Sequence, residues 1–238
     1  WGLFPSAAFA WKVKEESFLK DVDALNDFKV RLGFGVTGQQ EGIGDYTYFA
    51  SYTPNSQGAY YPIIGDGVTY RPDAYNKNLT WEKSNNFNAG FELGLWNWLD
   101  FNVDFFIKET KDMLYYSPLP PSQGSPSGIY RNEMDMKNTG IEFEINADIF
   151  NTENFKWNVS LNGTHYKNEL TKLPISKPAE KYPDGYQSGS YWRKIGGSLY
   201  DFYAYEYAGV DKTNGKPLYN KYLTDENGNE TGVVETTS

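Results

Sequence analysis

The sequence contains no cysteine and a single histidine, His165. The absence of cysteine excludes disulfides, thiolate metal sites and cysteine nucleophiles. One histidine leaves little material for a Ser-His-Asp triad or a multi-histidine metal site, so a surface or rim position is expected for it. Positive charge is also scarce, because 22 Lys and Arg face 31 Asp and Glu for a formal net charge of -9. Nucleic-acid binding needs the opposite balance and is therefore not expected.

Long apolar runs are missing as well. No stretch approaches about 18 consecutive apolar residues, which excludes transmembrane helices but not transmembrane β-strands, since only one face of such a strand is apolar. The first residues lack a basic segment followed by an apolar one, so no signal peptide is expected in this sequence. Helical periodicity is confined to one short candidate, residues 15–25.

Aromatic residues, in contrast, are abundant. They make up 18% of the chain, with 20 tyrosines among them, while all hydrophobic types together reach only 39%. An aromatic ring with a polar tip suits a boundary between a dry and a wet environment. Membrane interfaces, binding clefts and sugar-binding surfaces all fit this composition.

Apolar and polar residues alternate with a period of two, which predicts β-strands with one apolar and one polar face. The apolar positions of the clearest runs are Phe9, Trp11 and Val13; Phe28, Val30, Leu32, Phe34 and Val36; Phe87, Ala89, Phe91, Leu93 and Leu95; Leu99, Phe101, Val103, Phe105 and Ile107; Ile141, Phe143, Ile145, Ala147 and Ile149; and Phe155, Trp157, Val159 and Leu161. The first run is expected to pair with the second.

Short and long connections between these runs alternate along the chain. Asn97–Trp98 and Asn151–Asn154 are short, whereas Gly38–Asn78, Ser117–Lys137 and Pro174–Tyr191 are long. This asymmetry is typical of an outer-membrane barrel, which has short turns on one side and long loops on the other.

Strand length and aromatic placement favour the same architecture. The run from Leu79 to Trp96 could extend about 50–60 Å, more than a membrane's apolar band of roughly 25 Å requires even when the strand is tilted. Its apolar positions lie beside the short turn, and aromatic residues flank the short turns where an interfacial girdle would lie. The predicted fold class is all-β: an antiparallel up-and-down transmembrane β-barrel, of which about eight strands are counted here.

An ordered set of short motifs resembles one family in particular. Asn78–Glu82 (NLTWE) fits a "P-N-L-x-W-E" strand start, although Lys77 stands in place of the usual proline. The other segments, in order, are Gly2–Ser6 with Trp11, Phe28–Arg31, Gly35–Gln39, Lys108–Leu114, Pro118–Pro121, Asn138–Glu142, Gly209–Asp211 and Asn214–Tyr219. Together they resemble the barrel of SusC/RagA-family TonB-dependent outer-membrane transporters.

The resemblance implies a bacterial outer-membrane protein with a barrel of roughly 22 strands that is closed by a plug. It implies import of glycans, oligosaccharides or peptides together with a SusD-like surface lipoprotein, driven through TonB, with no cofactor, metal or catalytic residue. Residues 1–238 would then be a partial barrel domain, with the plug and the C-terminal closing strand lying outside this sequence.

Two alternatives remain at this point. A soluble β-sandwich that binds carbohydrate would share the strand period and the aromatic content. A glycoside hydrolase would need paired carboxylates, and Glu142 with Glu144, or Asp100 with Asp104, lie on one strand face. A polar barrel lumen explains these carboxylates more simply, and the sequence is not expected to be an enzyme.

The best candidates for ligand contact are loop tyrosines. Their rings could stack on sugars and their hydroxyls could hydrogen-bond to them, although packing within the loop or against a lid protein would place them equally well. The candidate residues are Tyr46, Tyr48, Tyr52, Tyr60, Tyr61 and Tyr70. Asp211–Gly215 and Asp225–Gly228 only partly match a calcium loop, and their Asn-Gly pairs predict hairpin turns instead.

Overall fold

The computed structural model describes residues 2–54, 70–120, 122, 128–224 and 230–236, and nearly all regular structure within them is β-strand. In chain order the elements are β1 (Ser6–Lys12), the 3-10 helix η1 (Val13–Glu15), β2 (Leu25–Gln39), β3 (Tyr52–Pro54), β4 (Tyr70–Pro72), β5 (Glu82–Leu95), β6 (Leu99–Ser117), β7 (Ile129–Asn151), β8 (Lys156–Lys172), β9 (Tyr186–Ser188), β10 (Tyr191–Arg193), β11 (Tyr207–Val210), β12 (Pro217–Thr224) and β13 (Glu230–Thr236).

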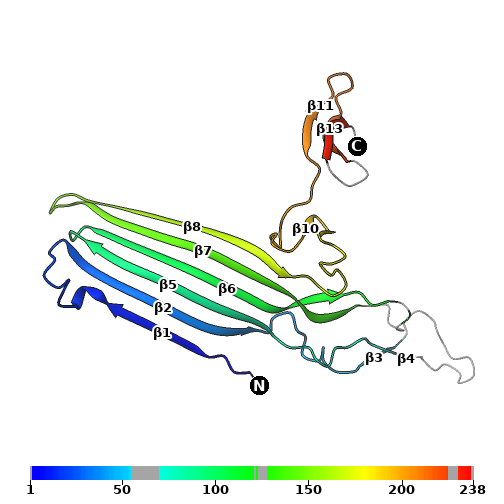
Figure 1. Cartoon of the computed structure of the whole chain (residues 1–238), viewed down its shortest axis with the longest axis horizontal. Helices are drawn as coiled ribbons and strands as arrows, with labels where there is room; N and C mark the ends of the chain where they lie inside the picture. Colours follow the sequence, from blue (N-terminus) through cyan, green and yellow to red (C-terminus); the bar gives the residue numbers. More distant parts are fainter. Residues whose placement is uncertain (1, 55–69, 121, 123–127, 225–229, 237–238) are drawn as a thin grey trace, which may run out of the picture.

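One six-stranded antiparallel sheet dominates the molecule, in the order β1-β2-β5-β6-β7-β8. Its strands lie side by side in Figure 1, with tight turns at one end, on the left, and the longer loops at the other. β7 alone has 23 residues, about 75 Å at the rise of an extended chain. The predicted all-β, up-and-down arrangement and the two kinds of connection are confirmed.

The remaining strands form smaller sheets at the loop end or beyond it. β3 pairs with β4 and β9 with β10, while β11, β12 and β13 make a separate three-stranded sheet. Six strands of the described residues therefore belong to the continuous sheet, compared with the expected count of about eight. The predicted turn after Asp211 is present, since the Gly215 amide donates to the Asp211 carbonyl at 2.8 Å. The second Asn-Gly pair lies outside the described residues.

The β5–β6 hairpin has a three-residue loop, one residue longer than predicted, because Leu95 pairs directly with Leu99. Trp96 and Asn97 both adopt positive φ, at 53° and 59°. The Asn26 and Asn97 side chains hydrogen-bond at 2.6 Å, and Asn26 Oδ1 accepts the Asn97 amide at the same distance. These bonds hold the positive-φ turn against the start of β2.

The helix expected at residues 15–25 is wrong. Only η1 forms, and Leu25 already belongs to β2. The Lys14 ammonium donates to three main-chain carbonyls of the following turns, those of Leu19, Lys20 and Val22, at 2.9–3.1 Å. A short isolated helix is marginal without a surface to pack against, so side-chain bonding to the turns prevails here.

The long connection expected at 117–137 is also shorter than predicted, because β7 starts at Ile129. Its first residues look like a loop in sequence, since they are mostly polar. Asn132 explains the difference: its amide donates to the carbonyls of Thr80 and Asp112, at 2.8 and 2.7 Å. The Asn132 side chain thus bonds to the backbone of neighbouring segments, which ties this polar stretch into the sheet.

The compact core lies at the loop end and not in the middle of the sheet. It contains Met134, Leu170, Leu173 and Tyr186, with partly buried neighbours from β6 and from the segment after β8. Most of the long sheet has no second layer among the described residues, and large apolar side chains remain exposed on it. Within the described ranges, no helix is long and apolar enough to cross a membrane.

Candidate functional site: the polar face and the loop end

The two faces of the long sheet differ chemically, because successive side chains of a strand point to opposite sides. The strand register aligns residues into rows across β2, β5, β6, β7 and β8. Two rows of the polar face are Lys29, Glu92, Asn102, Glu144, Asn162 and Arg31, Gly90, Asp104, Glu142, Thr164. Two rows of the apolar face are Phe28, Leu93, Phe101, Ile145, Leu161 and Val30, Phe91, Val103, Phe143, Gly163.

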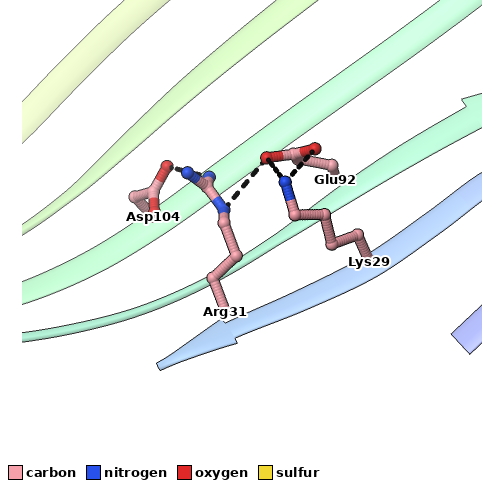
Figure 2. Close-up of polar contacts among 4 residues, drawn as sticks. All are labelled: Lys29, Arg31, Glu92 and Asp104. Carbon is pink, nitrogen blue, oxygen red and sulfur yellow. Dashed lines mark hydrogen bonds and ion pairs between the residues drawn. The ribbon is translucent and has the colours of Figure 1, made fainter. Parts of the chain in front are cut away.

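Four charged residues of the polar face form a connected network (Figure 2). Arg31 donates from its terminal nitrogen to Asp104 Oδ2 at 2.8 Å, and its Nε lies 3.1 Å from Glu92 Oε1. Lys29 Nζ lies 3.3 Å from both oxygens of the same Glu92 carboxylate. The network joins β2, β5 and β6, so it couples three strands through side chains as well as through main-chain pairing.

Gly90 makes possible the contact between Arg31 and Asp104, whose strands are not adjacent. Arg31 on β2 and Asp104 on β6 each pair with Gly90 of β5, which lies between them. A Cβ at Gly90 would collide with the Asp104 carboxylate and lie 2.8 Å from the Val103 carbonyl oxygen. The missing side chain therefore opens a gap through which the two charges meet. Sequence reasoning missed this pairing, although a glycine between Phe and Ala in an alternating strand was a usable signal.

Beside this network the polar face is hollowed. A concavity of about 350 Å³ is lined by Arg31, Glu92, Asn102, Asp104, Glu142, Glu144, Asn162 and Thr164 among others. Its lining has one cation against four carboxylates. Glu142 and Glu144 share one face as predicted, and Glu144 accepts a hydrogen bond from the Asn146 amide at 2.9 Å. Such a surface can hydrogen-bond to hydroxyls and amides and attracts positive charge.

The predicted loop tyrosines lie at the loop end and are solvent-exposed where described: Tyr46, Tyr48, Tyr52 and Tyr70. Tyr60 and Tyr61 lie outside the described residues. Tyr52 and Tyr70 belong to the β3–β4 pair. Tyr48 and Trp81 line a concavity of about 760 Å³, so the structure brings one predicted tyrosine to a hollow and two others to a neighbouring hairpin.

Aromatic rings also gather at the turn end of the sheet. Trp96 and Trp98 stack with ring centroids 6.1 Å apart. Phe150 contacts both Phe155 and Trp157, at 5.8 and 6.0 Å. These five rings lie in or beside the two short turns, where an interfacial girdle was expected.

Comparison with known proteins identifies the family to which this architecture belongs. The profile described as "TonB dependent receptor-like, beta-barrel" matches residues 1–231. The chain belongs to this family. Its sheet is therefore part of the wall of an outer-membrane barrel, with the polar face toward the lumen and the apolar face toward lipid.

Relatives within the TonB-dependent receptor family support the assignment. The TonB-dependent receptor SusC of Bacteroides thetaiotaomicron is 39% identical over 97% of this chain, and TonB-dependent receptor P39 of Formosa agariphila is 34% identical over 88%. The RagAB peptide importer in its closed-closed state matches 99% of the chain at 30% identity with a TM-score of 0.76. These relatives are receptors and importers rather than enzymes.

The chain spans about a fifth to a quarter of the length of these TonB-dependent relatives. It covers 24% of SusC and 24% of the matched RagAB chain. The family assignment therefore describes one stretch of barrel wall.

Among the described residues, no group of three or more His, Asp or Glu side chains is placed to hold a metal ion.

The apolar face of the TonB-dependent barrel wall has an oblique upper edge. On each strand, this edge is marked by the last large apolar residue toward the loop end. That residue is Phe87 on β5 and Ile107 on β6, and the two pair with each other. On β7 it is Ile141, one row nearer the turn end, and on β8 it is Leu161, two rows nearer again. Barrel strands tilt by about 35–45°, so a membrane plane crosses the register rows at an angle. His165, which pairs with Ile141, thus lies above the apolar band, in agreement with the expected surface or rim position.

Proposed function

We propose that this chain contributes part of the barrel wall of a TonB-dependent outer-membrane importer for oligosaccharides or peptides. The observation that carries the proposal is the contrast between the two faces of the sheet. An exposed apolar face suits contact with lipid, and a charged, hollowed face suits a water-filled lumen. The soluble sandwich alternative needs a second sheet packed on the apolar face, and none covers it in the described part of the chain.

Transport in this proposal requires no bond cleavage by the wall. A solute passing the polar face exchanges its water hydrogen bonds for those of the carboxylates and amides lining it. The mixture of charged pairs and neutral amides keeps each contact weak enough to be released. Residues 1–238 would form one partial barrel domain, and the plug that reaches TonB would belong to the rest of the protein.

The loop end is the proposed site of first contact. A SusD-like surface lipoprotein would cover it, and Tyr46, Tyr48, Tyr52, Tyr60, Tyr61 and Tyr70 would contact the solute there. Support comes from the exposure of the described members of this set and from the hollow beside Tyr48. Rigid aromatic side chains provide large contact areas at low entropic cost.

Uptake by cells tests the proposal. Cells lacking the intact protein should fail to take up a labelled oligosaccharide or peptide that wild-type cells accumulate, and inactivation of TonB should have the same effect. Unchanged uptake of every solute in both strains would exclude an import role.

Purified intact protein tests the hydrolase alternative. It should release no reducing ends from oligosaccharides, and the double variant Glu142→Gln, Glu144→Gln should behave in the same way. Cleavage that the double substitution abolishes would favour the hydrolase instead.

A further inference from the structure

A second hollow lies at the loop end of β7 and β8, beneath the segment 194–201. Its volume is about 880 Å³, within the usual range of sites for small molecules. The side chains that matter here are Tyr166, Asn138, Asn168, Lys194 and Tyr200. Asn138 and Asn168 pair across the two strands and join through their amides at 2.7 Å on the polar face. The hollow therefore opens from the lumen side of the wall, at its mouth.

The segment that covers this hollow is fixed to the edge of β8. The Leu170 amide donates to the Gly197 carbonyl at 2.8 Å, and the Gly196 amide donates back to the Leu170 carbonyl at 2.9 Å. Asn168 Oδ1 accepts both the Leu199 amide, at 2.8 Å, and the Ser198 hydroxyl, at 3.1 Å. Gly196 has a φ of 77°, a conformation that favours glycine. The hollow is thus pre-formed by the chain itself.

The floor of the hollow is apolar and continuous with the loop-end core. Met113, Met136 and Leu199 line it and pack against Met134, Leu170, Leu173 and Tyr186. Its walls carry two exposed tyrosines, Tyr166 and Tyr200, with 61% and 63% of their surface accessible. An apolar base with flat aromatic walls and a few polar groups is the usual composition of a small-molecule site.

Several hydrogen-bonding groups of this site remain available for a ligand. Asn168 is engaged on both its oxygen and its nitrogen. In the described ranges, the Asn138 Nδ2, the two tyrosine hydroxyls and the Lys194 ammonium have no hydrogen-bond partner in the protein. The free groups are donors, and the two hydroxyls also accept.

We propose that this hollow, formed by Tyr166, Tyr200, Asn138 and Lys194, is a saccharide-binding subsite at the mouth of the lumen. The inference rests on the proposed import function and names the solute class within it. Sugar rings have apolar faces that can lie on the tyrosine rings. Their hydroxyls both donate and accept, which matches the Asn138 amide and the tyrosine hydroxyls.

A peptide fits this site less well. One recurring mode of peptide recognition adds the peptide main chain to a free strand edge. At Leu170 the edge of β8 already pairs with Gly196 and Gly197, so the hollow offers no such edge there. Recognition at this hollow therefore runs through side chains, and its free hydroxyl, amide and ammonium groups suit a ligand rich in hydroxyls.

Binding to arrays tests the subsite in the intact protein, purified in detergent. The probes are an array of short neutral oligosaccharides and a library of short neutral peptides, both small enough to enter the hollow. Wild-type protein should retain at least one oligosaccharide. Tyr166→Ala and Tyr200→Ala should each weaken it about tenfold, and Asn138→Ala by less. Tyr166→Phe should keep most of the affinity, since it preserves the ring.

The matched control is Tyr130→Ala, which removes an exposed tyrosine of the loop end that packs on Tyr116, away from the hollow. It should bind as wild type does. Equal binding by wild type, Tyr166→Ala and Tyr200→Ala would overturn the subsite, as would retention of peptides alone. Peptide retention would leave the import proposal standing, whereas a cell that takes up neither class would refute import itself.

Discussion

At the scale of single residues, two positions of the wall depend on unusual backbone or steric conditions. Gly90 leaves room for the contact between Arg31 and Asp104. Asp112, in the loop-end part of β6, has a φ of 58°. Its amide donates to Asp135 Oδ1 at 3.0 Å, where the β6–β7 register shifts. Both positions are constrained by the immediate neighbours on adjacent strands and not by the strand's own pattern.

Gly90→Ala should destabilise the intact protein by roughly 1–3 kcal/mol, because the new methyl group overpacks against a carboxylate and a main-chain carbonyl. Gly33→Ala is the matched control, since a Cβ there would meet only Asn88 Cβ at 4.0 Å. That variant should be neutral or more stable by up to about 1 kcal/mol. Urea midpoints in detergent compare the two, and equal midpoints would show that Gly90 is not sterically required.

Asp112→Gly and Asp112→Val should change the free energy of unfolding by different amounts, with the valine variant the less stable of the two. Glycine adopts positive φ readily, whereas a β-branched residue there costs about 1–2 kcal/mol. The ion pair lost in both variants, Lys83 to Asp112 at 3.9 Å, lies between exposed side chains and contributes little. The same unfolding assay should rank the valine variant below the glycine variant. The reverse order would argue against backbone strain at this bulge.

At the scale of strands, the apolar band crosses the sheet obliquely. The register alone would treat Phe105, Ile141 and His165 as equivalent, since they occupy one row. The tilt of the strands makes them unequal, because Phe105 then lies deeper in the membrane than His165. From β6 to β8 the last apolar residue moves toward the turn end of the sheet. This displacement, read from the sequence and the strand pairing together, indicates the tilt.

Phe105→Arg should cost about 1–2 kcal/mol, because Phe105 lies inside the apolar face, one row below its upper edge, and the penalty for a cation reaches about 2–4 kcal/mol only at the middle of the lipid face. His165→Arg, in the same register row, should cost less than about 1 kcal/mol, as expected for an interfacial position. The yield of folded protein in outer membranes and its unfolding free energy measure the difference. If both substitutions cost the same, the band follows the register rows and the oblique boundary is wrong.

At the scale of the whole molecule, the wall and its loop end are stabilised differently. The wall is stabilised by main-chain pairing between its strands, and its exposed apolar face contacts lipid in the membrane. The loop end has its own small core, in which Tyr186 is 6% exposed. Burial raises the pKa of Tyr186 above 10.0, and the neighbouring Tyr115 phenol adds to the rise, while Arg193 partly opposes it.

This raised pKa predicts an alkaline weakness confined to the loop end. A phenol whose folded pKa exceeds its unfolded pKa stabilises the fold at neutral pH, and that contribution falls as the pH rises above about 10. Limited proteolysis should then cut residues 173–199 faster at alkaline pH while the wall stays intact. Tyr186→Phe cannot ionise and should show a weaker dependence. An identical pH dependence in the variant would assign the effect to another group.

The chain's own sequence determined most of the long strands and their two faces, and it located the two short turns to within one residue. Alternation with a period of two is a local property, so it identified β2, β5, β6 and β8 and the oily side of each. The order of motifs identified the family. Prediction from the sequence was wrong for segments whose conformation depends on side-chain contacts outside the alternating pattern. Examples are the turns held by Lys14 and the first third of β7, held by Asn132.

Only the tertiary structure decided which residues meet across strands. The register brought Arg31 to Asp104 across Gly90, and the fold of the loop put Tyr48 in the lining of the same hollow as Trp81. The strand pairing also set the slope of the apolar band. The fold of segment 194–201 formed the hollow that Tyr166 lines. Strand pattern specifies a side chain's face but not its neighbour, because a neighbour is defined by pairing between segments far apart in the chain.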